Sequence, residues 1–153
     1  MTNFFIKAIA TVFGIGYLPM APGTWATIAG VVITYYLGSQ LFIFTLLLLG
    51  LLVLGIVSTG LMEKLLNKKD PSIACIDEVV GVMIGLWGLP LSWPVMICGF
   101  FLFRAFDMFK IYPINKLENQ PGGWGIMLDD CMAGVYTNVI LRIALYGSQV
   151  FFK

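Results

Sequence analysis

The sequence predicts an all-α, polytopic helical membrane protein with about five spanning helices and a short N-terminal interfacial helix. Of its 153 residues, 59% are hydrophobic and 11% are charged, and the mean hydropathy is +0.94. Soluble domains carry about 25% charged residues, so this chain has too little polar surface to coat a globule in water. Residues 40–62 form an apolar run long enough to cross ~30 Å of hydrocarbon. The length predicts one integral-membrane domain, residues 1–153.

The N-terminal segment is too short to span a membrane. Residues 3–13 are mostly apolar and include Lys7, and we expect them to lie in the membrane interface with this lysine toward water. Residues 14–24 contain the glycines and prolines typical of a loop. Thr24 is a good N-cap residue, which predicts a helix over about 25–37.

The apolar run is followed by a polar loop over residues 63–70. The motif Asp70-Pro71-Ser72 is typical of a helix start, because proline is tolerated in the first turn, and it predicts a third spanning helix over about 72–89. The prolines of residues 90–94 do not suit a helix interior and indicate a tight connection. A fourth helix is predicted over 94–110.

The C-terminal part is predicted as a loop over 111–128 and a last helix over about 130–150. The loop contains the segment Gly122–Gly125. Backbone amides of such a segment can surround a phosphate, but a flexible turn is an equally good interpretation.

Basic residues predict the orientation in the membrane. Five crossings would place on one side a set of seven: Lys7, Lys64, Lys68, Lys69, Arg104, Lys110 and Lys116. The other side would receive the uncharged turns near 38–40 and 90–94 and the terminal Lys153. Because positive charge is enriched in cytoplasmic loops, we expect the charged side to face the cytoplasm.

Composition excludes several classes of site. The chain has no histidine, which removes histidine bases, ligands and phosphohistidine intermediates, and a net charge of +1 gives no reason to expect nucleic acid. The three cysteines are too few and too scattered for a disulfide framework or a zinc site. Cys98 and Arg104 have the spacing of a cysteine-phosphatase loop, but an apolar helix surrounds them. No cleavage site follows the N-terminus, so we expect an uncleaved chain.

Five acidic residues are predicted to lie on the charged side, next to sequence of membrane depth. They are Asp77, Glu78, Asp107, Asp129 and Asp130. An unpaired charge there costs about 2.5 kcal/mol or more, and only Arg104 and Lys110 lie beside them. Surplus carboxylates without histidine or cysteine favour a Mg²⁺ site.

Two cations of the fourth helix are predicted to bind an anion. Arg104 and Lys110 each stand three residues from Asp107, so each can contact it on the helix surface. A guanidinium and an ammonium group beside a metal suit a phosphate dianion. The alternative is that both side chains only extend to the membrane surface at a helix end.

Four motifs together resemble those of the phosphatidylglycerophosphatase A family of bacterial inner-membrane lipid phosphatases. They are Pro19-x-x-Pro22-Gly23-Thr24, Asp70-x-Ser72-x-x-x-x-Asp77-Glu78-x-x-Gly81, Phe103-Arg104-x-x-Asp107-x-x-Lys110 and Gly122-Gly123-x-Gly125-Ile126-Met127-x-Asp129-Asp130-x-x-Ala133-Gly134. Ile111 departs from the pattern, which has a proline there. The resemblance implies Mg²⁺-dependent hydrolysis of phosphatidylglycerol phosphate to phosphatidylglycerol and phosphate at the cytoplasmic face of the bacterial inner membrane, with no nucleotide cofactor.

The hypothesis gives roles to eight residues of the motifs. Mg²⁺ is expected on Asp77, Glu78, Asp129 and Asp130, the phosphate on Arg104, Lys110 and Thr24, and the catalytic groups are expected to be Asp107, Asp129 and Asp130. A metal-activated water or an aspartyl-phosphate intermediate both agree with these roles.

Two other functions remain as alternatives. CDP-alcohol phosphotransferases also use membrane-surface carboxylates, but their pattern ends in two aspartates four apart, whereas Asp129 and Asp130 are adjacent. A small membrane transporter would place ionisable groups near the bilayer midplane rather than at helix ends.

Overall fold

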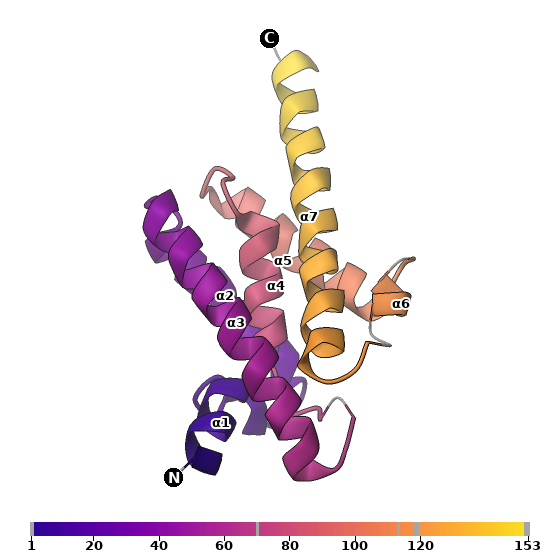
Figure 1. Cartoon of the computed structure of the whole chain (residues 1–153). Helices are drawn as coiled ribbons and strands as arrows, with labels where there is room; N and C mark the ends of the chain where they lie inside the picture. The colour runs from indigo at the N-terminus through magenta and orange to yellow at the C-terminus, as the bar shows by residue number, and fades with distance from the viewer. Residues whose placement is uncertain (1, 70, 113, 118–119, 152–153) are drawn as a thin grey trace.

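The protein is all-helical within the residues that this computed structural model describes, which are 2–69, 71–112, 114–117 and 120–151. No strand occurs in these ranges (Figure 1). The helices, in chain order, are α1 (Thr2–Ala10), the 3₁₀ helix η1 (Ile15–Tyr17), α2 (Pro22–Leu37), α3 (Leu41–Leu66), α4 (Ile76–Leu86), α5 (Trp93–Phe109), α6 (Ile114–Leu117) and α7 (Gly123–Phe151).

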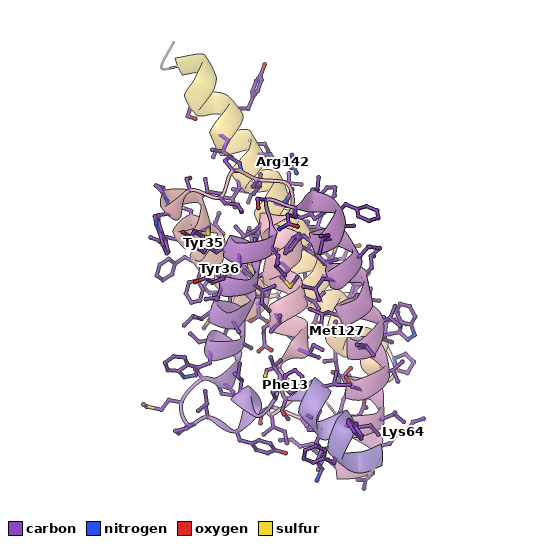
Figure 2. All side chains as sticks on the ribbon, turned by 90° about the vertical axis from the view of Figure 1, so that its left-hand side faces the viewer. Phe13, Tyr35, Tyr36, Lys64, Met127 and Arg142 are labelled. Atoms are coloured by element: carbon purple, nitrogen blue, oxygen red, sulfur yellow. The ribbon has the colours of Figure 1, made fainter. Side chains whose placement is uncertain are left out.

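Five of these helices run up and down through one bundle. Helices α2, α4 and α7 begin at the end of the bundle where α3 and α5 finish, and α1 lies at that end too (Figure 1). We call it the site end, because it carries the predicted acidic residues. The C-terminal part of α7 extends beyond the opposite end (Figure 1). Lys64 and Arg142 lie toward the two opposite ends (Figure 2).

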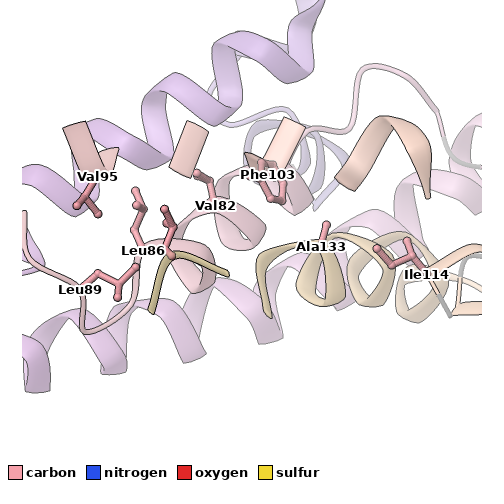
Figure 3. Packing of buried hydrophobic residues seen from close by; sticks show 8 residues of the cluster. Val82, Leu86, Leu89, Val95, Phe103, Ile114 and Ala133 are labelled. Carbon is pink, nitrogen blue, oxygen red and sulfur yellow. The ribbon is translucent and has the colours of Figure 1, made fainter. Parts of the chain in front are cut away.

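Helix α4 is the central element of the bundle. Nine of its eleven residues are buried, and it packs against α2, α3, α5 and α7. Its Val82 and Leu86 belong to an apolar cluster with Phe103 of α5 and Ala133 of α7 (Figure 3). A short helix that is apolar on all sides is a core helix. The position of α4 therefore decides where the acids at its start lie.

Glycines bring the backbones of α4 and α7 into contact. A Cβ atom on Gly81 would lie 2.8 Å from the carbonyl oxygen of Asp130, and one on Gly134 would overlap the carbonyl oxygen of Gly81. Only glycine permits this approach at both positions. The contact places Asp130 directly beside the first turns of α4.

The far end of α4 is held by two polar side chains of α7. Asn138 Nδ2 donates to the carbonyl oxygens of Ile84, Gly85 and Trp87 at 3.2, 3.1 and 2.9 Å. Arg142 Nη2 donates to the Trp87 oxygen at 3.0 Å, and its Nε donates to Asn138 Oδ1 at 2.7 Å. These bonds satisfy carbonyls that a helix end leaves free. Arg142 is therefore a capping residue of α4.

The predicted starts of α2 and α4 were wrong. Helix α2 begins at Pro22 after Ala21, so Thr24 lies inside its first turn rather than capping it. Helix α4 begins at Ile76 rather than near residue 72, because the N–H of Cys75 donates to the carbonyl oxygen of Ala10. Asp70, part of the predicted start, lies outside the described residues.

The predicted loop over 111–128 contains more helix than expected. It includes α6, and α7 begins at Gly123 instead of near residue 130. A Cβ atom on Gly123 would overlap the carbonyl oxygen of Ile56 in α3, so the glycine allows α7 to start against that helix. Asp129 and Asp130 consequently lie in the second turn of α7, not at its start.

The number of spanning helices predicted from the sequence is not confirmed. Within the described ranges, α3 is the one helix that is long and apolar enough to cross a membrane. Helices α2, α4 and α5 have 16, 11 and 17 residues. Helix α7 has 29 residues but carries two aspartates and an arginine.

Candidate active site

A cavity of about 260 Å³ lies at the site end, between the starts of α2, α4 and α7 and the last turn of α5. All the predicted acids and both predicted phosphate-binding cations line it: Asp77, Glu78, Arg104, Asp107, Lys110, Asp129 and Asp130. Residues more than fifty positions apart in the chain therefore meet around one space, as the sequence analysis predicted.

Three of the carboxylates form a compact group. Asp77, Glu78 and Asp130 each offer an oxygen, and these oxygens all lie within 4.8 Å of one another. Asp77 and Asp130 are buried, with 9% and 3% of their surface exposed. Glu78 Oε2 and Asp130 Oδ2 are buried oxygens with no hydrogen-bond partner in the described part of the chain. Buried carboxylates at this separation repel one another and lose hydration, which is costly unless a cation lies among them.

A hard divalent cation fits this group by its donor chemistry. Mg²⁺ binds carboxylate oxygens at 2.0–2.1 Å, so ligands on opposite sides of the ion are roughly 4.2 Å apart. The three oxygens need only small side-chain rotations to share one ion. The donor set contains oxygen alone, which favours Mg²⁺ or a similar hard cation over zinc.

Arg104 is held at the cavity wall by acids. Its Nη1 donates to Asp107 Oδ2 at 2.7 Å and lies 3.9 Å from Glu78 Oε1. Asp107 is the third residue after Arg104 in α5, the spacing at which helix side chains meet. The guanidinium is therefore placed beside the three-carboxylate group with donors still available for an anion.

Lys110 reaches the cavity through an unusual backbone conformation. It is the C-cap of α5 with φ 42°, a left-handed conformation that glycine or asparagine normally occupies. From this position its Nζ donates to Asp129 Oδ2 at 3.0 Å. Asp129 Oδ1 also accepts from the N–H of Asp130. In the structure, Asp129 therefore contacts Lys110 and lies outside the three-carboxylate group. The sequence analysis predicted it among the metal ligands.

The Pro22-Gly23-Thr24 motif contributes a different residue from the expected one. Thr24 is half-buried and does not line the cavity, whereas Pro22 and Gly23 do. A Cβ atom on Gly23 would overlap Glu78 Oε1 and lie 3.2 Å from Arg104 Nη1. The presence of Gly23 in the Pro22-Gly23-Thr24 motif was the signal in the sequence that could have identified this residue. A phosphate contact of Thr24 stays a prediction.

Ser72 and Cys75 also lie near the acids. Ser72 lines the cavity and was not assigned a role from the sequence. Burial, reinforced by the negative charge of Glu78, raises the pKa of the Cys75 thiol to about 12. A thiol that stays protonated is a poor nucleophile, and Cys75 does not line the cavity, whose polar lining consists mainly of carboxylates and cations.

Several known proteins resemble this chain over most of its length. The family model described as phosphatidylglycerophosphatase A matches residues 8–145. A Bacteroides thetaiotaomicron protein provisionally named a phosphatidylinositol-3-phosphatase is 36% identical, over 93% of this chain and 94% of its own length. Proteins named phosphatidylglycerophosphatase A from Haemophilus influenzae and Escherichia coli are 38% and 35% identical, over 92% and 87% of this chain and 89% and 79% of their own lengths. No solved structure matches the chain significantly.

These matches identify the class of the protein, which is an enzyme and a phosphoric monoester hydrolase. Neither a transporter nor a phosphotransferase is among these relatives. More particularly, the chain belongs to the phosphatidylglycerophosphatase A family, as its four motifs predicted.

Proposed function

We propose that the protein hydrolyses phosphatidylglycerol phosphate to phosphatidylglycerol and phosphate in a Mg²⁺-dependent reaction. The observation that carries the proposal is the group formed by Asp77, Glu78 and Asp130, with buried unbonded oxygens on two of them, beside Arg104 and Lys110 in one cavity. Carboxylates for a cation and cations for a phosphate are what a metal-assisted phosphomonoesterase requires. Two relatives named phosphatidylglycerophosphatase A support the substrate.

In this reaction, the residues of the cavity would have three roles: they bind the cation, bind the phosphate and accept a proton. When bound, Mg²⁺ would neutralise the carboxylates and stabilise charge on the phosphate oxygens. Arg104 offers a planar pair of donors and Lys110 a mobile ammonium, so both can turn from Asp107 and Asp129 to an entering phosphate. Asp107 is then available to accept the proton of the water whose oxygen bonds to phosphorus as the bond to the glycerol oxygen breaks.

An aspartyl-phosphate route uses the same cavity and is separated by trapping the intermediate. If an Asp107 oxygen bonds to phosphorus as the glycerol oxygen leaves, an acid quench of the reaction with ³²P-labelled substrate should leave label bound to the protein. Direct attack by water releases labelled phosphate and leaves no label on the protein.

We also propose that the protein is a multi-pass protein of the bacterial inner membrane, with the cavity on the cytoplasmic face. The alternating directions of α2, α3, α4, α5 and α7 support several crossings around the apolar α3. Large apolar side chains on the outer faces, such as Phe42 and Phe101 with 77% and 66% exposed, support contact with lipid. Lysines at the end of α3 support the orientation.

Site-directed labelling tests this orientation. In a cysteine-free background, Ser92→Cys lies at the end opposite the cavity, and Lys68→Cys lies at the site end. A membrane-impermeant maleimide added to intact cells stripped of the outer membrane should label Ser92→Cys alone. Labelling of Lys68→Cys instead would contradict the proposal.

Phosphate release tests the activity. Detergent-solubilised protein should release phosphate from phosphatidylglycerol phosphate only with Mg²⁺, and Asp130→Asn should lower kcat at least 100-fold, the scale expected for loss of a group that acts on the transition state. Glu63→Gln removes an acid outside the cavity and should behave as the wild type. Full activity in EDTA or in Asp130→Asn would refute the metal-site hypothesis.

A second substrate is favoured by one relative. The Bacteroides protein is provisionally named a phosphatidylinositol-3-phosphatase, and the lipid in that name is also a phosphomonoester on a diacyl lipid. Measuring kcat/KM for both lipids under one condition decides between them. A ratio above about 100, equivalent to 2.7 kcal/mol, would identify the preferred headgroup.

A further inference from the structure

A groove of about 310 Å³ between α2 and α5 has no role in the site described above. Its walls are apolar side chains, among them Ile28, Val31 and Val32 of α2 and Trp93, Ile97 and Phe101 of α5. Several are open to the surroundings: Val32, Ile97 and Phe101 are 47%, 53% and 66% exposed. The described part of the chain therefore leaves this groove uncovered.

The groove begins next to the catalytic cavity. The same two helices form both features, because Gly23 of α2 and Arg104 of α5 meet at the cavity wall. Phe101 precedes Arg104 by three residues and Ile28 follows Gly23 by five, so the groove starts about 5–8 Å from the cavity along the helix axes. If the headgroup of a lipid is bound at Arg104, the first carbons of its acyl chain are therefore close enough to enter the groove.

The length of the groove suits one leaflet of a bilayer. From Arg104 to Trp93 is eleven residues of α5, roughly 16 Å at 1.5 Å per residue. Half of the hydrocarbon thickness is about 15 Å. At the far end, the rings of Trp93 and Tyr35 stack with centroids 5.4 Å apart, and Tyr35 lies well away from Phe13 of the site end (Figure 2).

We propose that this groove binds an acyl chain of the lipid whose phosphate occupies the cavity, so that α2 and α5 hold the substrate along its whole length. The inference rests on the proposed function and adds the binding site for the apolar part of the substrate. Burial of each methylene group contributes about 0.8 kcal/mol. The groove therefore selects membrane lipids over water-soluble phosphomonoesters, which fit the cavity alone.

A second apolar groove provides the matched control. It lies between α3 and α7 and is lined by Leu49 and Val139, together with Asn138, which caps the end of α4 remote from the cavity. Leu49 is 51% exposed, close to the values for Val32 and Ile97. Leu49→Trp therefore adds similar bulk on the same kind of surface without narrowing the α2–α5 groove.

The test compares Val32→Trp and Ile97→Trp with Leu49→Trp on dioleoyl and dihexanoyl phosphatidylglycerol phosphate in detergent with Mg²⁺. Groove variants should raise KM for the dioleoyl lipid about tenfold or more, the effect of losing contact with two methylene groups. Their kcat/KM for the short-chain lipid should match the wild type, which also shows that they are folded. Equal losses on both lipids, no loss, or an equal loss in Leu49→Trp would overturn the inference.

Photo-crosslinking gives a measurement that needs no variant. A substrate analogue with a diazirine on one acyl chain should label α2 and α5 peptides of the wild-type protein, and excess dioleoyl lipid should prevent it. Labelling mainly on α3 and α7 would overturn the inference. A wild type that releases phosphate from neither lipid would instead contradict the proposed function, so the two failures are distinguishable.

Discussion

Replacing Gly23 by alanine should damage the active site without damaging the fold. Gly23 is the second residue of α2, and one added methyl group would overlap Glu78 Oε1 and lie 2.9 Å from Glu78 Cδ and 3.2 Å from Arg104 Nη1. Both neighbours are ends of flexible side chains, so they can move away while the backbone stays in place. The Glu78 carboxylate would move away from Asp77 and Asp130, and the Arg104 guanidinium would move away from Gly23 while staying close to Asp107.

The magnitudes follow from these contacts. Alanine is a better helix former than glycine by about 1 kcal/mol, so the thermal midpoint should stay constant or rise slightly. Displacing one metal-binding carboxylate or the group that orients it costs typically 10–100-fold in metal affinity or activity. We therefore expect the Mg²⁺ concentration for half-maximal activity to rise at least tenfold.

The assay is phosphate release from phosphatidylglycerol phosphate as a function of Mg²⁺, with the thermal midpoint measured on the same preparations. Gly50→Ala is the matched control, because a Cβ atom at Gly50 in α3 meets nothing within 4 Å. It should show the wild-type Mg²⁺ dependence. An unchanged Mg²⁺ dependence in Gly23→Ala, or the same change in both variants, would refute the packing argument.

Three further outcomes are expected. Mg²⁺ at 100 times its dissociation constant should stabilise the wild type by about 2.7 kcal/mol and raise its thermal midpoint, and Asp130→Asn should lose most of this shift in a thermal melt. Asn138→Leu should lower the free energy of unfolding by about 1–3 kcal/mol, measured in denaturant, because partly buried carbonyls of α4 lose their donor. Cys98→Ser should leave phosphate release unchanged, since Cys98 is exposed on α5 and does not line the cavity.

The sequence predicted which segments form helices better than it predicted where those helices begin and end. The apolar run of residues 40–62 became α3, Leu41–Leu66, because its composition alone favours a helix at membrane depth. The starts of α4 and α7 depend instead on a hydrogen bond from Cys75 to Ala10 and on the contact of Gly123 with Ile56. Such contacts join distant parts of the chain, so local patterns did not predict them.

The same distinction applies to the site. Placing the acids at one end of the bundle required only the alternation of helices, and the cavity confirms that they meet. Which acid joins which partner depends on helix rotation. Adjacent residues on a helix point about 100° apart, so Asp130 lies against α4 while Asp129 contacts Lys110. The sequence contains no measure of that rotation, so both acids were predicted as metal ligands, and a metal contact of Asp129 stays a prediction.

Helix α4 shows why the far end of the bundle matters to the chemistry. It has eleven residues, no side-chain N-cap, and two acids in its first turn, where the positive end of the helix dipole favours negative charge. At its other end, Arg142 places a positive charge on the negative end of the dipole and bonds directly to Trp87. Helix α7 thus contacts α4 at both ends, through Asp130 and through the Arg142 cap. Because both contacts belong to one helix, the position of α7 along α4 fixes the distance between Asp130 and Glu78, and with it the size of the proposed cation site.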